Sequence, residues 1–240
     1  MSGAALILDE VWLALGTRLL VAPLSLRVAP GTVTTIMGPS GCGKSSLLAS
    51  LCGMPDPAFR CGGRLWLGDR EIGRLPPHQR RLGVLFQDDL LFPHLTVGEN
   101  ISFGLPPGGR AWRRAQLEAA LVEAGLAGFA ERDPATLSGG QRARIALLRT
   151  LAARPGALLL DEPFAKLDAE LRNRFRNFVF DHGRRLGLPT LLVTHDPADA
   201  AAAGGPVLAS APPDPARETP GSGAPARQPP DGLPQPGGAG

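Results

Sequence analysis

The alternation of apolar and polar residues changes twice along the chain. In the first part, short apolar runs separated by turns predict β-strands, namely Ala4–Leu8, Val11–Leu15, Leu24–Val28 and Val33–Met37, with glycine and proline marking the turns after Leu15. Further along, apolar residues recur at helical spacing in Arg110–Ala124 and Gln141–Ala153. A fully apolar strand is then predicted at Ala157–Leu160 and a further strand at Thr190–Thr194, on either side of a predicted helix over Asp168–Arg185.

This succession of elements predicts an α/β fold, because buried strands that alternate with helices form a parallel sheet. Leu82–Phe86 is predicted as a further buried strand and Gly63–Leu67 as another strand. We expect an N-terminal antiparallel β subdomain, and a helical subdomain inserted into the core at about residues 88–153. One domain would span residues 1–209. Residues 210–240 are rich in proline and glycine and are predicted to be disordered, since they lack the apolar surface that offsets the entropy of ordering.

Composition excludes several classes of protein. The net charge is +3 and the arginines are scattered, so no nucleic-acid partner is expected. Cys42, Cys52 and Cys61 form neither a C-x-x-C pair nor a Cys/His cluster, and their odd number argues against a disulfide framework. A reducing cytoplasm fits this cysteine usage. No apolar run approaches the roughly 18 residues that cross a bilayer, so we expect any work at a membrane to be peripheral.

The strongest chemical signal lies between the predicted strand Val33–Met37 and the apolar run Leu47–Leu51. The residues there are Gly38, Pro39, Ser40, Gly41, Cys42, Gly43, Lys44, Ser45 and Ser46. They match the pattern G-x-x-x-x-G-K-[ST], in which glycines let backbone N–H groups turn toward phosphates. In such a P-loop, Lys44 reaches the β- and γ-phosphates and the Ser45 hydroxyl ligates Mg²⁺. The sequence therefore predicts a P-loop NTPase (RecA-like) core that binds a nucleoside triphosphate with Mg²⁺.

A second half of the site is predicted where the apolar run Ala157–Leu160 ends in Asp161 and Glu162. In this Walker B arrangement, Asp161 would hold Mg²⁺ and Glu162 would take a proton from the attacking water. The alternative for an acidic pair at a strand end is a solvated turn. The P-loop earlier in the chain favours the catalytic interpretation.

The run Leu137 to Gln141 reads L-S-G-G-Q and stands immediately ahead of a predicted helix. A serine hydroxyl, two glycine N–H groups and a helix N-terminus form a potential anion site, and the alternative is a serine N-cap with a glycine-rich turn. At this point the chain resembles the ATP-binding cassette (ABC) ATPases, whose signature L-S-G-G-Q lies between the two Walker motifs as it does here.

The resemblance covers residues 4 to about 203 and implies further site residues. It implies that Gln87 is a catalytic glutamine that senses Mg²⁺ and water, that Asp168 contacts nucleotide across a dimer, and that His195 acts on the γ-phosphate. Residues 86–101 resemble the importer branch that includes thiamine, sulfate, iron and polyamine ATPases.

The resemblance also implies an architecture and a function. Two copies would lie head to tail, with each ATP between Lys44 of one copy and the signature of the other, which is Ser138, Gly139, Gly140 and Gln141. The implied function is ATP hydrolysis that powers solute import through separate permease subunits, with a solute-binding protein as an indirect partner, on the cytoplasmic face of the inner membrane. A soluble ABC ATPase acting on DNA or ribosomes and an exporter subunit remain alternatives, whereas a structural adaptor is disfavoured by the presence of Glu162 and His195.

Two residues depart from the pattern of such importers. Leu15 stands where an aromatic residue usually stacks on adenine, and Ala165 replaces a usual serine. Trp12 is interpreted as the only nearby aromatic that could compensate. Side chains alternate faces along a strand, and positions 12 and 15 differ by an odd number, so we expect Trp12 to point away from the base.

Overall fold

The structure, a computed structural model, describes residues 3–165, 167 and 169–209. The segment 210–240, predicted to be disordered, lies outside this described part, as does Asp168. Within the described part the predicted α/β fold is confirmed, since a parallel sheet and an antiparallel sheet are both present and helices pack on them.

The antiparallel sheet has the strand order β2-β1-β4-β5. Its strands are β1 (Leu6–Leu15), β2 (Arg18–Val28), β4 (Phe59–Leu67) and β5 (Arg70–Glu71). The prediction of two strands with a turn between them near the N-terminus is wrong, because β1 continues through Asp9 and Glu10 with a shift of register. Glu10 adopts a φ of 50° there, and its backbone N–H donates to the Ser25 hydroxyl of β2 at 2.9 Å. The polar pair therefore makes a bulge inside one strand.

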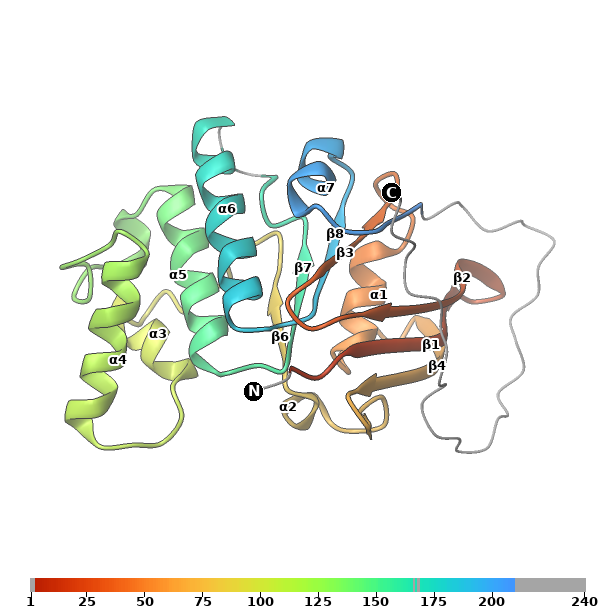
Figure 1. The fold of residues 1–240 in the computed structure, drawn as a ribbon, viewed down its shortest axis with the longest axis horizontal. Helices are drawn as coiled ribbons and strands as arrows, with labels where there is room; N and C mark the ends of the chain where they lie inside the picture. Colours follow the sequence, from red (N-terminus) through yellow and green to blue (C-terminus); the bar gives the residue numbers. More distant parts are fainter. Residues whose placement is uncertain (1–2, 166, 168, 210–240) are drawn as a thin grey trace.

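The parallel sheet has the strand order β6-β7-β8-β3-β9. Its strands are β3 (Val33–Met37), β6 (Leu82–Leu85), β7 (Ala157–Asp161), β8 (Thr190–Thr194) and β9 (Val207–Ala209). Helix α1 (Lys44–Leu51) packs against one face of this sheet and also against the antiparallel sheet, because Leu47, Leu48 and Leu51 share one apolar cluster with residues of both. Figure 1 shows α1 on the side of the parallel sheet where β1 and β2 lie.

Helices α5 (Gly139–Ala152) and α6 (Ala169–Arg185) cover the opposite face of the parallel sheet, as Figure 1 shows. Helices α3 (Val97–Gly104) and α4 (Arg110–Glu123) pack on the outer side of α5 through a third apolar cluster. The helical part therefore extends from the side of the parallel sheet opposite the antiparallel sheet. A short helix α2 (Pro77–Arg80), a 3-10 turn η1 (Pro134–Thr136) and helix α7 (Pro197–Ala203) complete the described elements.

Arg80, at the end of α2, joins the C-terminal end of α1 to the segment that follows β5. Its guanidinium donates to the carbonyl oxygens of Ser50 (3.1 Å) and Leu51 (2.7 Å) at the C-terminal end of α1. The same group donates to the carbonyl oxygens of Gly73 (2.7 Å) and Leu75 (2.8 Å). A cation at a helix C-terminus satisfies carbonyls that have no partner within the helix. This arginine therefore fixes the end of α1 opposite to the P-loop.

Candidate active site

The predicted phosphate loop connects the end of β3 to the start of α1, and its glycines are required by its backbone. Gly41 and Gly43 have φ values of 81° and 90°, in the left-handed region that other residues rarely adopt. A Cβ atom on Gly43 would also lie 3.2 Å from the Cβ of Leu20 in β2. The sharp turn places Lys44 as the first residue of α1, so that the N-terminal N–H groups of the helix face the loop.

Lys44 is almost fully buried, with 5% of its side chain exposed. Its ammonium donates to the carbonyl oxygens of Gly38 (2.8 Å) and Pro39 (2.7 Å), and it lies 4.0 Å from Glu162 Oε1. A buried cation needs partners of this kind, because leaving it unpaired away from water costs several kcal/mol. The loop thus holds the lysine inside its own curve, next to the acidic pair at the end of β7.

Ser45 and Asp161 come from the two halves of the site and meet directly. The Ser45 hydroxyl donates to Asp161 Oδ1 at 2.9 Å. Burial raises the pKa of Asp161 above its usual range, and the neighbouring Glu162 raises it further, whereas the Ser45 hydrogen bond and Lys44 lower it. A buried carboxylate is stabilised in its charged form when a cation lies close to it. A hydroxyl and a carboxylate oxygen at this separation fit the oxygen ligands that Mg²⁺ requires.

Glu162 follows Asp161 at the carboxyl end of β7 with a φ of 45°, an uncommon value for a residue other than glycine. Its backbone N–H donates to the carbonyl oxygen of Val193 at 2.9 Å, which fixes the strand end against β8. One carboxylate oxygen faces Lys44 and the other lies 3.0 Å from His195 Nδ1. Glu162 is therefore held between a buried lysine and a half-exposed histidine. A proton acceptor in catalysis needs such a fixed orientation.

A cavity of about 490 Å³ opens at this place. Its polar end is lined by the phosphate loop from Ser40 to Ser46, by Gln87 and by Glu162. Its other end is lined by residues of the antiparallel sheet, which are Leu15, Arg18, Leu20 and Phe59. The structure thus brings Lys44, Ser45, Ser46, Gln87, Asp161, Glu162 and His195 together, as the motifs predicted.

Sequence reasoning missed the part of the cavity formed by Arg18 and Phe59. Both begin a strand that was predicted to start later in the chain, so no local pattern marked them. The interpretation that Trp12 is the only nearby aromatic is wrong, because Phe59 lines the cavity. Trp12 is buried against Ala14 and Leu19 and is not among the residues that line the cavity in the described part of the chain.

The L-S-G-G-Q run makes a local structure of its own. Ser138 caps α5 by accepting from the N–H of Gln141 at 3.3 Å, while Gln141 Oε1 accepts from the N–H of Ser138 at 3.0 Å. This is a capping box, which satisfies N–H groups at the start of the helix. Gly140 packs so closely on Leu171 that a Cβ atom would overlap it. Among the described residues, those from Ser138 to Gln141 are not part of the cavity that contains Lys44.

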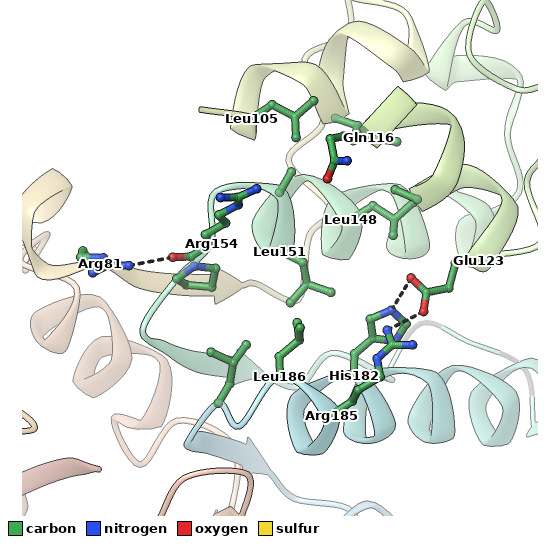
Figure 2. A pocket seen from close by; sticks show the side chains of 15 residues that line it. Arg81, Leu105, Gln116, Glu123, Leu148, Leu151, Arg154, His182, Arg185 and Leu186 are labelled. Atoms are coloured by element: carbon green, nitrogen blue, oxygen red, sulfur yellow. Dashed lines mark hydrogen bonds and ion pairs between the residues drawn. The ribbon is translucent and has the colours of Figure 1, made fainter. Parts of the chain in front are cut away.

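A second cavity, of about 450 Å³, lies between α4, α5 and the end of α6 (Figure 2). Leucines line it, and at one side Glu123 lies 3.1 Å from His182 Nε2 and pairs with Arg185. At the other side Arg81 donates to the carbonyl oxygen of Arg154 at 3.3 Å. The predicted site residues that the structure describes do not line this cavity.

Comparisons with known proteins point to one family. A family model described as "ABC transporter" matches residues 21–165. The chain is 48% identical, over 199 residues, to the uncharacterized ABC transporter ATP-binding protein YnjD of Escherichia coli (strain K12), which covers 82% of this chain and 91% of that relative. It is 39% identical, over 200 residues, to the Fe(3+) ions import ATP-binding protein FbpC of Agrobacterium fabrum, covering 82% of this chain but only 56% of that relative.

One solved structure resembles the fold of most of this chain. A dimeric structure of a post-hydrolysis state of the ATP-binding cassette MJ0796, bound to ADP and Pi, matches with a TM-score of 0.70 and 28% identity over 82% of this chain and 90% of that chain. Among residues 3–165, 167 and 169–209, no helix has the length and apolar character needed to cross a bilayer.

Proposed function

This chain belongs to the ABC transporter family, and we propose that within it the chain is the ATP-hydrolysing subunit that powers solute import through separate permease subunits. The observation that carries this proposal is the convergence of Lys44, Ser45, Asp161 and Glu162 on one cavity. The name of FbpC, an Fe(3+) ion import protein, supports the direction of transport. The chain spans about half the length of that relative. We therefore do not assign Fe(3+) as the solute of this chain.

The residues of the site divide the work of hydrolysis between them. Lys44 would exchange its two carbonyl partners for phosphate oxygens, which are stronger acceptors because they are charged. Glu162 accepts the proton of the attacking water, and His195 orients its carboxylate through Nδ1. Ser45, Asp161 and Gln87 are proposed to hold Mg²⁺, which neutralises developing charge on the phosphates when bound.

A second copy of the chain is the proposed partner at the nucleotide. Ser138 to Gln141 are not part of the cavity of their own copy, within the described residues, which fits a role on the ATP of another copy. The dimeric state of the ATP-binding cassette MJ0796 supports this arrangement. Asp168, proposed to contact the same nucleotide, lies outside the described residues.

Permease subunits are proposed to bind beside Gln87. The segment after it exposes Leu90, and the neighbouring α3 exposes Phe103, whose ring lies 4.9 Å from that of Phe92. Exposed apolar groups gathered in this way are typical of a protein contact. We propose that the chain works peripherally on the cytoplasmic face of the inner membrane, with a solute-binding protein as an indirect partner.

The test is ATP hydrolysis by the purified chain with and without Mg²⁺, measured as phosphate release. Lys44→Ala should lower the rate by about 10²–10³-fold, because a preorganised cation on the transferred phosphate is removed. Arg184→Ala is the matched control, since it removes an exposed cation that pairs with Asp181 at the surface. Hydrolysis by Lys44→Ala at the rate of the unmodified chain would refute the assignment.

A second measurement addresses the partner copy. Glu162→Gln keeps the shape of the side chain but removes the proton acceptor, so ATP should remain bound and hold two copies together. Size-exclusion chromatography in ATP should then show a dimer for Glu162→Gln and a monomer for the double variant with Lys44→Ala. A monomer for both variants would contradict the shared-nucleotide arrangement.

A further inference from the structure

Three side chains form a row across the antiparallel sheet at the end of the cavity that this sheet lines. Leu15 in β1 pairs with Arg18 of β2 on one side and with Phe59 of β4 on the other. Residues directly opposite each other on antiparallel strands project to the same face of the sheet. All three line the cavity that contains Lys44, so this row is one wall of the cavity.

Within this row, only one side chain offers a flat aromatic surface. Leu15 is 45% exposed, and its branched aliphatic side chain has no π face. Phe59 is half-buried, because part of it packs on the apolar cluster that also contains Leu13. Its ring is therefore anchored from behind while the remainder faces the cavity. An anchored ring loses little rotational freedom when a ligand stacks on it.

Trp12 is excluded from this role by its pairing. It lies opposite Gly62, and a Cβ atom on that glycine would overlap the indole ring. The indole is packed with Ala14 and Leu19 and is 8% exposed. From Trp12 to Leu15 the pairing with β4 is regular, so alternation places Trp12 on the face opposite to Leu15 and Phe59.

We propose that Phe59 is the platform on which the purine base of ATP stacks, in place of an aromatic residue at position 15. The inference rests on the proposed function, since the triphosphate must occupy the end of the cavity formed by Lys44, Ser45 and Ser46. The base then extends toward the antiparallel sheet, where Phe59 presents its ring. Arg18, at the other end of the row, adds a planar guanidinium that also stacks on bases.

The test separates the base from the phosphates by comparing two ligands. Isothermal titration calorimetry with Mg²⁺ gives the Kd of ATP and of inorganic triphosphate for the full chain and its variants. A stacked base contributes enough that Phe59→Ala should raise the Kd of ATP by about 5- to 150-fold. The Kd of inorganic triphosphate, which has no base, should stay the same.

Two further variants keep the result interpretable. Phe59→Leu retains apolar packing on the core without a π face, so it should raise the Kd of ATP in the same way. It serves as the test if Phe59→Ala does not fold. Phe59→Trp should preserve ATP affinity, and the fluorescence of the added indole should be quenched by ATP but not by inorganic triphosphate. Trp12→Phe is the matched control and should change neither Kd.

Two results would overturn the inference. One is an unchanged Kd for ATP in Phe59→Leu, and the other is an equal loss of affinity for ATP and inorganic triphosphate, which indicates that Phe59 only supports the phosphate loop. If the unmodified chain binds neither ligand, the proposed function fails and this inference fails with it. If the unmodified chain binds ATP no more tightly than inorganic triphosphate, the stacking inference fails and the proposed function stands.

Discussion

Replacing Asp199 by alanine should destabilise the protein strongly, because it leaves a buried arginine without its main partner. Arg176 and Asp199 are 6% and 3% exposed. The Nε of Arg176 donates to Asp199 Oδ1 at 2.6 Å, and its Nη2 pairs with the same carboxylate. The other carboxylate oxygen accepts from the buried Thr194 hydroxyl at 2.9 Å. Asp199→Ala therefore removes the main anion from a buried cation and the acceptor from a buried hydroxyl, between α6, α7 and β8.

The size of the effect follows from what remains around Arg176. Removing one partner of a buried ion pair costs about 3–5 kcal/mol. Asn173 Oδ1 still accepts from Arg176 Nη1 at 3.0 Å, and Asp196 Oδ2 stays 3.4 Å from Nη2. Asn173 is uncharged, and Asp196 also pairs with Arg172 and is partly exposed, so together they offset only part of the loss. We therefore expect the lower end of the range, about 3 kcal/mol. At about 2–4 °C per kcal/mol for a chain of this length, the melting temperature should fall by about 6–12 °C.

The assay is thermal unfolding followed by circular dichroism, without nucleotide. The matched control is Asp181→Ala, which breaks an ion pair with Arg184 whose side chains are 70% and 50% exposed. Such a surface pair contributes less than about 1 kcal/mol, so its loss should move the melting temperature by less than about 4 °C. The double variant Arg176→Met with Asp199→Leu removes both charges and should recover most of the stability. Equal melting temperatures for Asp199→Ala and Asp181→Ala would refute the reasoning.

Two other predictions concern titratable groups. Burial alone would raise the pKa of Glu123, but hydrogen bonds from Arg185 and His182 hold it below its ordinary value of 4.5. A carboxyl with a lowered folded-state pKa adds stability that is present above its ordinary pKa and is lost as pH falls through the folded-state pKa. The difference in urea midpoint between the unmodified chain and Glu123→Gln should thus be full at pH 7 and shrink below pH 4.5, and a pH-independent difference would contradict this. Burial raises the pKa of the Cys52 thiol to about 12, whereas Cys61 is exposed. Iodoacetamide at about pH 8 should therefore label Cys61 before Cys52, as followed by peptide mass spectrometry. Equal labelling rates would contradict the burial of Cys52.

The sequence predicted best those elements whose apolar pattern is complete within a few residues. Val33–Met37 and Thr190–Thr194 were predicted with the bounds that the structure has, because both are short runs of β-branched and apolar residues and are buried along almost their whole length. The polar pair Asp9 and Glu10 was interpreted as a turn, since no local pattern distinguishes a turn from a bulge. What decides between them is the pairing of β1 with β2 and β4, which is set by residues distant in the sequence.

The candidate site also divides into residues marked by local motifs and residues placed by strand pairing. The residues proposed to act on the phosphates lie within short motifs, so Lys44, Ser45, Asp161 and Glu162 could be predicted from the sequence to meet. Phe59 enters the cavity only because β4 pairs with β1 in a register that places it opposite Leu15. A contact made by register across strands carries no local sequence signature.

The two ends of the nucleotide cavity are built by different sheets, and this gives selection two independent targets. The row from Arg18 to Phe59 belongs to the antiparallel sheet, whereas Lys44 and Glu162 follow strands of the parallel sheet. Substitutions in the row should therefore change the affinity for the base without displacing the residues proposed to act on the phosphates. Affinity for the base and turnover can therefore change separately among descendants of this chain, through different strands of the fold.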